Sequence, residues 1–201
     1  MRKISLLILS ASILLQLQAQ KPLPVVTLNT AEPTPAGVSV TTTRNSVMVG
    51  GKKIDYTAYT GYLTLQNDTG KAIAKMFFTY YKKDGGDAAK RPLTFTFNGG
   101  PGSSSVWLHM GGLGPKRVLL KEDGAASGPP YRYINNEYTW LDKSDLVFID
   151  PVSTGYSRPA PGESPKQFHG YQEDISSMGA FVRDFLSRYE RWGSPKYLAG
   201  E

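Results

Sequence analysis

The sequence predicts an α/β protein in which an antiparallel β region leads into a parallel sheet. The first observation is a series of strand-like runs separated by the turn signals "VGGK", "NDTG" and "KDGGD". The second is "DLVFID", whose dense apolar character is typical of a strand buried on both faces. The third is the order strand, helix, strand near the end of the chain, which gives parallel neighbours in one sheet.

The antiparallel region is expected over residues 38–97. The runs "KIDYTAYTGYLTL" and "KAIAKMFFTYY" are rich in β-branched and aromatic residues and lie between the turn signals. We therefore interpret this part of the chain as a β-meander. The sequence "LTFTF" (93–97), at its end, is expected to form a short apolar strand.

A helix is expected from Tyr171 to Trp192. Apolar residues recur there at steps of three and four, which places them on one helix face. These residues are Tyr171, Ile175, Met178, Val182, Phe185, Tyr189 and Trp192. Gly193 is expected to stop the helix, with Pro195 just beyond, and "YLAG" is expected to form a short buried strand.

The first 19 residues have the layout of a secretory signal peptide. Arg2 and Lys3 precede an apolar run, and Ala19 offers a small residue for cleavage. The run is shorter than the roughly 20 residues that a membrane span needs. We therefore expect a secreted or periplasmic protein with no stable membrane anchor after cleavage. Residues 20–37 contain four prolines and are expected to form a linker or extended arm, which leaves 38–201 for the folded domain.

The composition excludes several classes of function. The chain has no cysteine, so it offers neither a thiolate nucleophile nor a cysteine metal site. His109 and His169 lack ligand spacing, and we expect neither a metal nor another cofactor. Removing Arg2 and Lys3 with the signal peptide lowers the formal net charge from +6 by two, to +4. The remaining charges are scattered, which argues against nucleic acid as a partner.

The sequence "NGGPGSSS" (98–105) follows directly on the predicted strand 93–97. Its glycines allow a close approach of the backbone to a ligand, and N–H groups in such a loop bind negative charge. The loop lacks the Lys of a phosphate loop and the spacing of a dinucleotide fingerprint. An oxyanion hole after an early strand of a hydrolase sheet fits this position. The alternative is a tight turn in which a serine caps the next helix.

Four stretches together resemble the serine carboxypeptidase family of α/β-hydrolases. In family order they are "NGGPGSSS" at 98–105, "LGP" at 113–115, "NEYTW" with "DLVFIDPVSTGYS" at 136–157, and "YLAGE" at 197–201. The last resembles the lead-in to Gly-Glu-Ser-Tyr-Gly, the nucleophile elbow. The resemblance implies the N-terminal part of an α/β-hydrolase fold, incomplete here, with the catalytic serine immediately after Glu201. Ser103, where the family has cysteine, suggests a bacterial-type member.

The resemblance also implies roles for individual residues. Gly100 would offer its N–H to the oxyanion, while Asn98, the Gly99 N–H and Glu201 would hold the free α-carboxylate of a peptide substrate. Two carboxylates repel each other unless a proton or a donor lies between them, so activity at acid pH is expected. The implied reaction releases C-terminal residues from peptides through an acyl-enzyme. The polypeptide 1–201 alone would lack the triad, and we expect it to be inactive and prone to aggregation.

Several alternatives stay open. Most family members have Glu where Gly112 stands, so a related acyltransferase or esterase is one alternative. Proline-releasing aminopeptidases share the Gly-Gly-Pro-Gly sequence but usually have His where Asn98 stands, and a non-catalytic peptide-binding fragment is the third. Asp150 and His169 precede the expected nucleophile, contrary to the chain order of this fold. We therefore expect Asp150 to fix a loop, and His169 and His109 to be partly exposed or packing residues.

Overall fold

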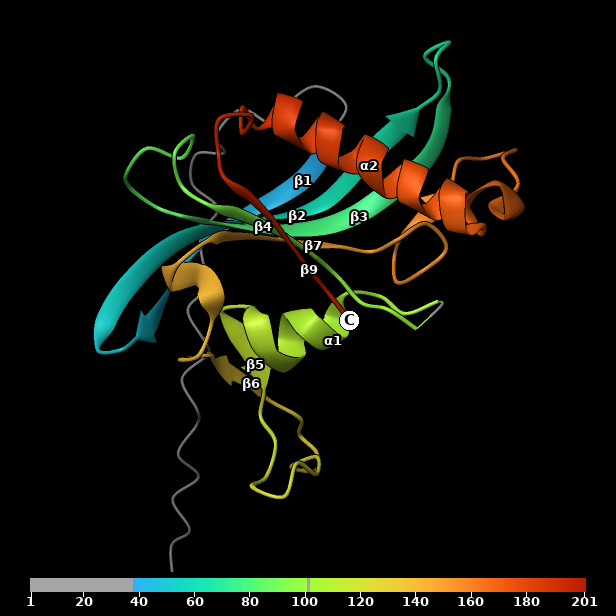
Figure 1. Cartoon of the computed structure of the whole chain (residues 1–201). Coiled ribbons are helices and arrows are strands. Elements are labelled where there is room, and N and C mark those ends of the chain that lie inside the picture. The colour runs from blue at the N-terminus through green and yellow to red at the C-terminus, as the bar shows by residue number, and fades with distance from the viewer. Residues whose placement is uncertain (1–37, 101) are drawn as a thin grey trace, which may run out of the picture.

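The computed structural model describes residues 38–100 and 102–201. The expected signal peptide and the expected arm lie outside these residues. A seven-stranded mixed sheet forms the centre of the molecule, in the order β1-β2-β3-β7-β4-β9, with β8 paired to β3 (Figure 1). The strands are β1 (Val38–Val49), β2 (Lys52–Gln66), β3 (Ala72–Lys83), β4 (Leu93–Phe97), β7 (Asp145–Ile149), β8 (Arg158–Pro159) and β9 (Lys196–Gly200).

The sheet begins antiparallel and continues parallel, which confirms the predicted fold class. Strands β1, β2 and β3 pair as antiparallel neighbours, and β3 pairs antiparallel with β7. Strand β4 then runs parallel to both β7 and β9. The predicted meander over 38–97 is therefore wrong at its end, because the meander stops at Lys83. The turn signal "KDGGD" (83–87) marks the end of β3 but does not say which strand lies next to it. Strand β7, which comes later in the chain, takes the position between β3 and β4.

The helix α2 (Tyr171–Arg188) covers one face of the sheet (Figure 1). Phe181, Phe185 and Leu186 are buried against it, and the rings of Phe181 and Phe185 meet Phe78 of β3 edge-on. The predicted apolar face is confirmed in its middle but wrong at its ends. Tyr171, Ile175 and Trp192 are 84%, 54% and 55% exposed.

The end of α2 also differs from the prediction. Glu190 adopts a φ of 54°, and the Arg191 N–H donates to the Leu186 carbonyl at 2.8 Å. This six-to-one bond, with a left-handed residue just before the donor, is a Schellman motif. The helix therefore ends at Arg188, five residues before Gly193, and Arg191 turns back into the protein.

The other face of the sheet carries a second buried cluster and the shorter elements. Tyr81, Leu141, Leu146 and Phe148 belong to this cluster. The elements beside it are α1 (Val106–Leu108), the π-helical turn η1 (His109–Leu113), the two-stranded sheet of β5 (Lys116–Val118) with β6 (Tyr133–Asn135), and the 3-10 turn η2 (Trp140–Asp142). A second 3-10 turn, η3 (Pro165–Phe168), precedes α2. Among the described residues, no helix is long and apolar enough to cross a membrane.

Strand β9 forms where expected but is not buried. Tyr197 and Leu198 are 57% and 71% exposed. In the described part of the chain, β9 pairs with β4 alone and lies at the end of the sheet. The prediction of a buried strand is wrong because strand pairing on one side leaves the other side open.

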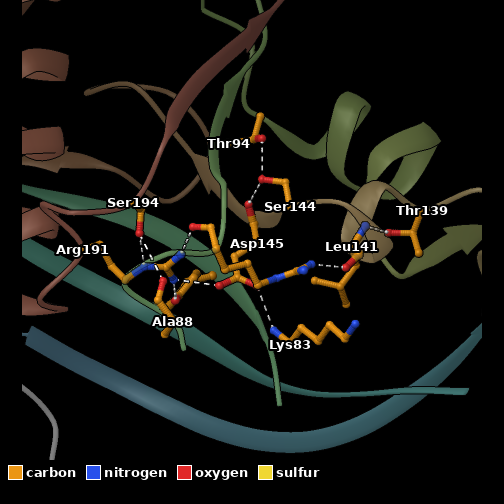
Figure 2. Close-up of polar contacts among 11 residues, drawn as sticks. Lys83, Ala88, Thr94, Thr139, Leu141, Ser144, Asp145, Arg191 and Ser194 are labelled. Carbon is orange, nitrogen blue, oxygen red and sulfur yellow. Dashed lines mark hydrogen bonds and ion pairs between the residues drawn. The ribbon is translucent and has the colours of Figure 1, made fainter. Parts of the chain in front are cut away.

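A buried charge network joins the amino ends of the parallel strands (Figure 2). Asp145, fully buried at the start of β7, accepts from Arg91 Nε and Arg191 Nη1, each at 2.7 Å. It also accepts from the Lys83 N–H at 3.0 Å, and Arg191 donates to the Tyr80 hydroxyl. Because Arg91 precedes β4 and Arg191 precedes β9, this network fixes the starts of all three parallel strands.

Candidate active site

The register of two strands places the first pair of candidate residues. Phe97 at the end of β4 pairs with Gly200 at the end of β9. Asn98 and Glu201, each the next residue, therefore lie side by side at the carboxyl edge of the parallel strands, where ligands bind in open α/β sheets. Asn98 Nδ2 donates to Glu201 Oε2 at 2.6 Å.

Asn98 is held from a second side. It is 7% exposed, and its Oδ1 accepts from the Leu108 N–H at 3.0 Å. Since the oxygen is occupied by this donor, the amide nitrogen is turned toward Glu201. Gly99 packs so closely on the Glu201 backbone that a Cβ would lie 1.7 Å from the Glu201 carbonyl oxygen. The structure thus brings Asn98, Gly99 and Glu201 together, as the predicted carboxylate site requires.

Gly100 lies next to this group in a turn of the loop. Its φ is 68°, a left-handed conformation that favours glycine. The Ser103 N–H closes the turn on the Gly100 carbonyl at 3.0 Å. The role of the Gly100 N–H as an oxyanion donor remains a prediction.

Ser105 and Asp150 fasten the far end of the loop. Ser105 stands at the start of α1 but makes no side-chain cap, so the capping alternative is wrong. Its hydroxyl has a single hydrogen and faces two buried carbonyls, those of Thr96 and Ile149, between which that hydrogen is shared. The Asp150 carboxylate, 6% exposed, accepts from the Ser105 N–H at 3.0 Å and from the Tyr156 N–H at 3.1 Å. The expected loop-fixing role of Asp150 is confirmed.

The two histidines behave as expected but differently from each other. His109 stacks on Phe148 with ring centroids 4.4 Å apart, and its Nε2 lies 2.6 Å from the Tyr81 hydroxyl. Burial lowers the pKa of His109 to about 4. His169 is exposed, with its Nε2 3.0 Å from Ser153 Oγ. Across 38–201, position 101 excepted, no group of acidic or histidine side chains is arranged to hold a metal.

The segment around Gly112 is clamped by the sequence "NEYTW". Asn136 Nδ2 donates to the carbonyls of Gly112 and Gly114 at 2.6 and 2.8 Å. Thr139 Oγ1 donates to the Leu113 carbonyl at 2.7 Å. These contacts explain why the Asn and Thr of one motif accompany the "LGP" of another. Sequence reasoning matched both motifs but gave no sign that they touch.

A cleft of about 720 Å³ opens beside the glycine-rich loop. Asn98, Gly99 and Gly100 line it, together with Ser153 and His169 from the chain after β7. Asp174, near the start of α2, also lines it, and partial burial raises the pKa of its carboxyl. The part that Ser153 and His169 play in this cleft was missed, because only the backbone conformation brings them together.

Residues 50–201 match the model of the family described as serine carboxypeptidase. The chain belongs to the serine carboxypeptidase family. The sheet described above is accordingly part of an α/β-hydrolase fold, and the family is one of peptidases.

Named members of the serine carboxypeptidase family show the extent of the match. The chain is 31% identical to carboxypeptidase Y of Saccharomyces cerevisiae over 147 residues, which are 72% of this chain and 25% of that protein. It is 28% identical to serine carboxypeptidase-like 40 of Arabidopsis thaliana over 155 residues, 76% of this chain and 28% of that protein. The pheromone-processing carboxypeptidase of Saccharomyces cerevisiae is 33% identical over 115 residues, 56% of this chain and 14% of that protein. The chain thus spans roughly a quarter or less of these relatives.

Proposed function

We propose that the chain is the N-terminal part of an exported serine carboxypeptidase that releases C-terminal residues from peptides. The observation that carries this proposal is the bond of 2.6 Å from Asn98 to Glu201, with Gly99 packed on the same point. An amide donor beside a carboxylate suits a second carboxylate that shares a proton with the first. The free α-carboxylate of a peptide would supply that second group, which favours activity at acid pH.

The chemistry in this proposal uses a serine placed directly after Glu201. That serine would attack the scissile carbonyl carbon, and the Gly100 N–H would stabilise the resulting oxyanion. A histidine later in the chain would take the proton of the serine during this attack and give it to the leaving amine as the C–N bond breaks. The serine then carries the acyl group as an acyl-enzyme. Water hydrolyses this ester and completes the cycle. No metal or other cofactor takes part.

Residues 1–19 support the exported location as part of the same proposal. Their basic start and apolar run are typical of a signal peptide, with Ala19 at the cleavage point. N-terminal sequencing of the mature protein in the periplasm or the medium is expected to begin at Gln20. A cytoplasmic protein that begins at Met1 would contradict this location.

The test of the activity compares peptides that differ only at their C-terminus. Protein expressed from the complete gene is expected to hydrolyse peptides with a free carboxylate and to spare their amides, with higher rates at pH 5 than at pH 8. Gly112 favours a second candidate, an esterase or acyltransferase, because the acidic residue common in the family is missing at that position. Equal activity toward esters, amides and free peptides would support this second candidate, and absence of all three activities would refute both.

A further inference from the structure

The loop after β7 contains an unfavourable backbone conformation. Ser153 has a φ of 75°, in the left-handed region that strongly favours glycine. The loop imposes this conformation, since the Ser153 N–H donates to the Ser157 carbonyl at 3.2 Å and the Thr154 N–H donates to the Pro151 carbonyl at 3.0 Å. Such residues concentrate at functional sites, where the surrounding structure holds them in place.

The conformation directs the Ser153 hydroxyl to one partner. Ser153 Oγ lies 3.0 Å from His169 Nε2, and both residues are exposed on the wall of the cleft. If Nε2–H donates to the serine, the serine O–H stays free to donate; if the serine donates to Nε2, the hydrogen on Nδ1 is the free donor. The Ser153–His169 pair therefore offers a donor to the cleft in either tautomer.

Glycine would satisfy the backbone at position 153 better than serine does. A hydrogen bond between two exposed side chains contributes little to the stability of the fold, because water competes for both groups. The presence of serine at position 153 is therefore better explained by a function of its hydroxyl in the cleft than by the conformation of the turn.

We propose that the Ser153–His169 pair binds the main chain of the peptide substrate on the amino-terminal side of the scissile bond. The inference rests on the proposed function, in which Asn98 and Glu201 hold the C-terminal carboxylate and Gly100 holds the scissile carbonyl. A carboxypeptidase has one residue beyond the scissile bond, so the remainder of the peptide extends from Gly100 along the cleft.

The chemistry of the cleft matches a peptide unit. The Ser153–His169 pair supplies a donor for a substrate C=O, and the Asp174 carboxyl, which lines the same cleft, supplies an acceptor for a substrate N–H. Since main-chain groups are the same in every peptide, this subsite selects for length and not for a particular side chain.

The experiment measures kcat/KM for a blocked dipeptide and for the blocked tripeptide and tetrapeptide that end in the same two residues. With protein from the complete gene, the longer peptides are expected to react about two- to tenfold faster, the range that one or two neutral hydrogen bonds support. Ser153→Gly and His169→Ala are expected to bring the ratio of tetrapeptide to dipeptide close to one. The matched control is Lys166→Ala, which is expected to keep this ratio. Lys166 is exposed and lies three residues before His169, but it does not line the cleft.

Ser153→Gly separates binding from folding. Because glycine prefers a φ of 75°, this variant is expected to unfold at the same or a higher temperature than the unchanged protein. A ratio that persists in both variants overturns the inference, as does an unchanged protein that cleaves the dipeptide and gains nothing from added residues. In those cases the proposed function stands, whereas a protein that cleaves none of the three peptides overturns both.

Discussion

Replacing Arg191 by methionine tests the buried charge network quantitatively. Arg191 is 1% exposed and donates to Asp145 Oδ2 at 2.7 Å, Ser194 Oγ at 2.8 Å, the Arg91 carbonyl at 3.0 Å and the Tyr80 hydroxyl. Methionine keeps the length of the apolar stem but removes all four bonds and the charge. The Asp145 carboxylate then remains buried with one of its two cations lost.

The size of the effect follows from this geometry. Removing one partner of a buried ion pair destabilises a protein by about 3–5 kcal/mol. Asp145 keeps Arg91 Nε and the Lys83 N–H, so the lower end, about 3 kcal/mol, applies. In a domain of about 150–250 residues each kcal/mol lowers the melting temperature by about 2–4 °C, so the fall is at most roughly 6–12 °C in the longer protein from the complete gene.

The assay is urea and thermal unfolding of protein from the complete gene, followed by circular dichroism. Lys90→Met is the matched control, because Lys90 pairs with Asp87 at 3.3 Å while its side chain is 87% exposed. Exposed pairs contribute about 0–1 kcal/mol, so this variant is expected to unfold almost as the unchanged protein does. If the free energies of unfolding of Arg191→Met and Lys90→Met differ by less than about 1 kcal/mol, the network does not hold the ends of the strands in place.

Three further predictions concern the other end of the sheet and its surroundings. Burial lowers the pKa of His109 to about 4, so between pH 6.5 and pH 4 this ring binds a proton in the unfolded chain but not in the folded chain. Stability therefore falls as the pH drops from about 6.5 to 4, by up to ~3 kcal/mol, and urea titrations at each pH should show a smaller fall for His109→Gln. Apart from its chain neighbours and its own helical turn, no described residue has an atom within 4 Å of a Cβ placed on Gly112, so Gly112→Glu is expected to fold normally. This variant is expected to raise the preference for free over amidated C-termini by ~10-fold, the effect of one charge-assisted hydrogen bond. An unchanged preference in paired peptide assays would place Gly112 outside the carboxylate site. Gly99→Ala forces a Cβ to 1.7 Å from the Glu201 carbonyl, and a loss of peptide hydrolysis of more than about 100-fold is expected; wild-type kinetics would show that Gly99 and Glu201 are not in contact.

Local sequence patterns predicted the elements of this fold better than their arrangement. The turn signals around Gly50 and the apolar run of β7 act within a few residues, so they were recognisable. The placement of β4 beyond β7 depends on pairing between distant strands, and the Schellman end of α2 depends on Glu190, a residue with no preference for the left-handed conformation. The exposure of Leu198 depends on which strand lies next to β9, which composition does not encode.

The candidate site was predictable where it follows from strand register and motif order. Asn98 and Glu201 come together because two parallel strands end at the same level, and both motifs were recognisable in the sequence. The hydrogen bonds of Asn136 to the Gly112 segment and of Ser153 to His169 were not predictable. They arise from side chains carried by loops, whose course no periodic pattern specifies.

The pairing of β4 with β9 also limits how this region can change in evolution. The chain between Arg191 and Glu201 is fixed at both ends, by the Asp145 network and by the bond to Asn98. One inserted residue in β9 would move Glu201 by about 3.3 Å relative to Asn98 and reverse the faces of the strand. The loop between β5 and β6 has no such double attachment to the site. Homologues are therefore expected to vary in length in that loop, while the spacing from Arg191 to Glu201 stays constant.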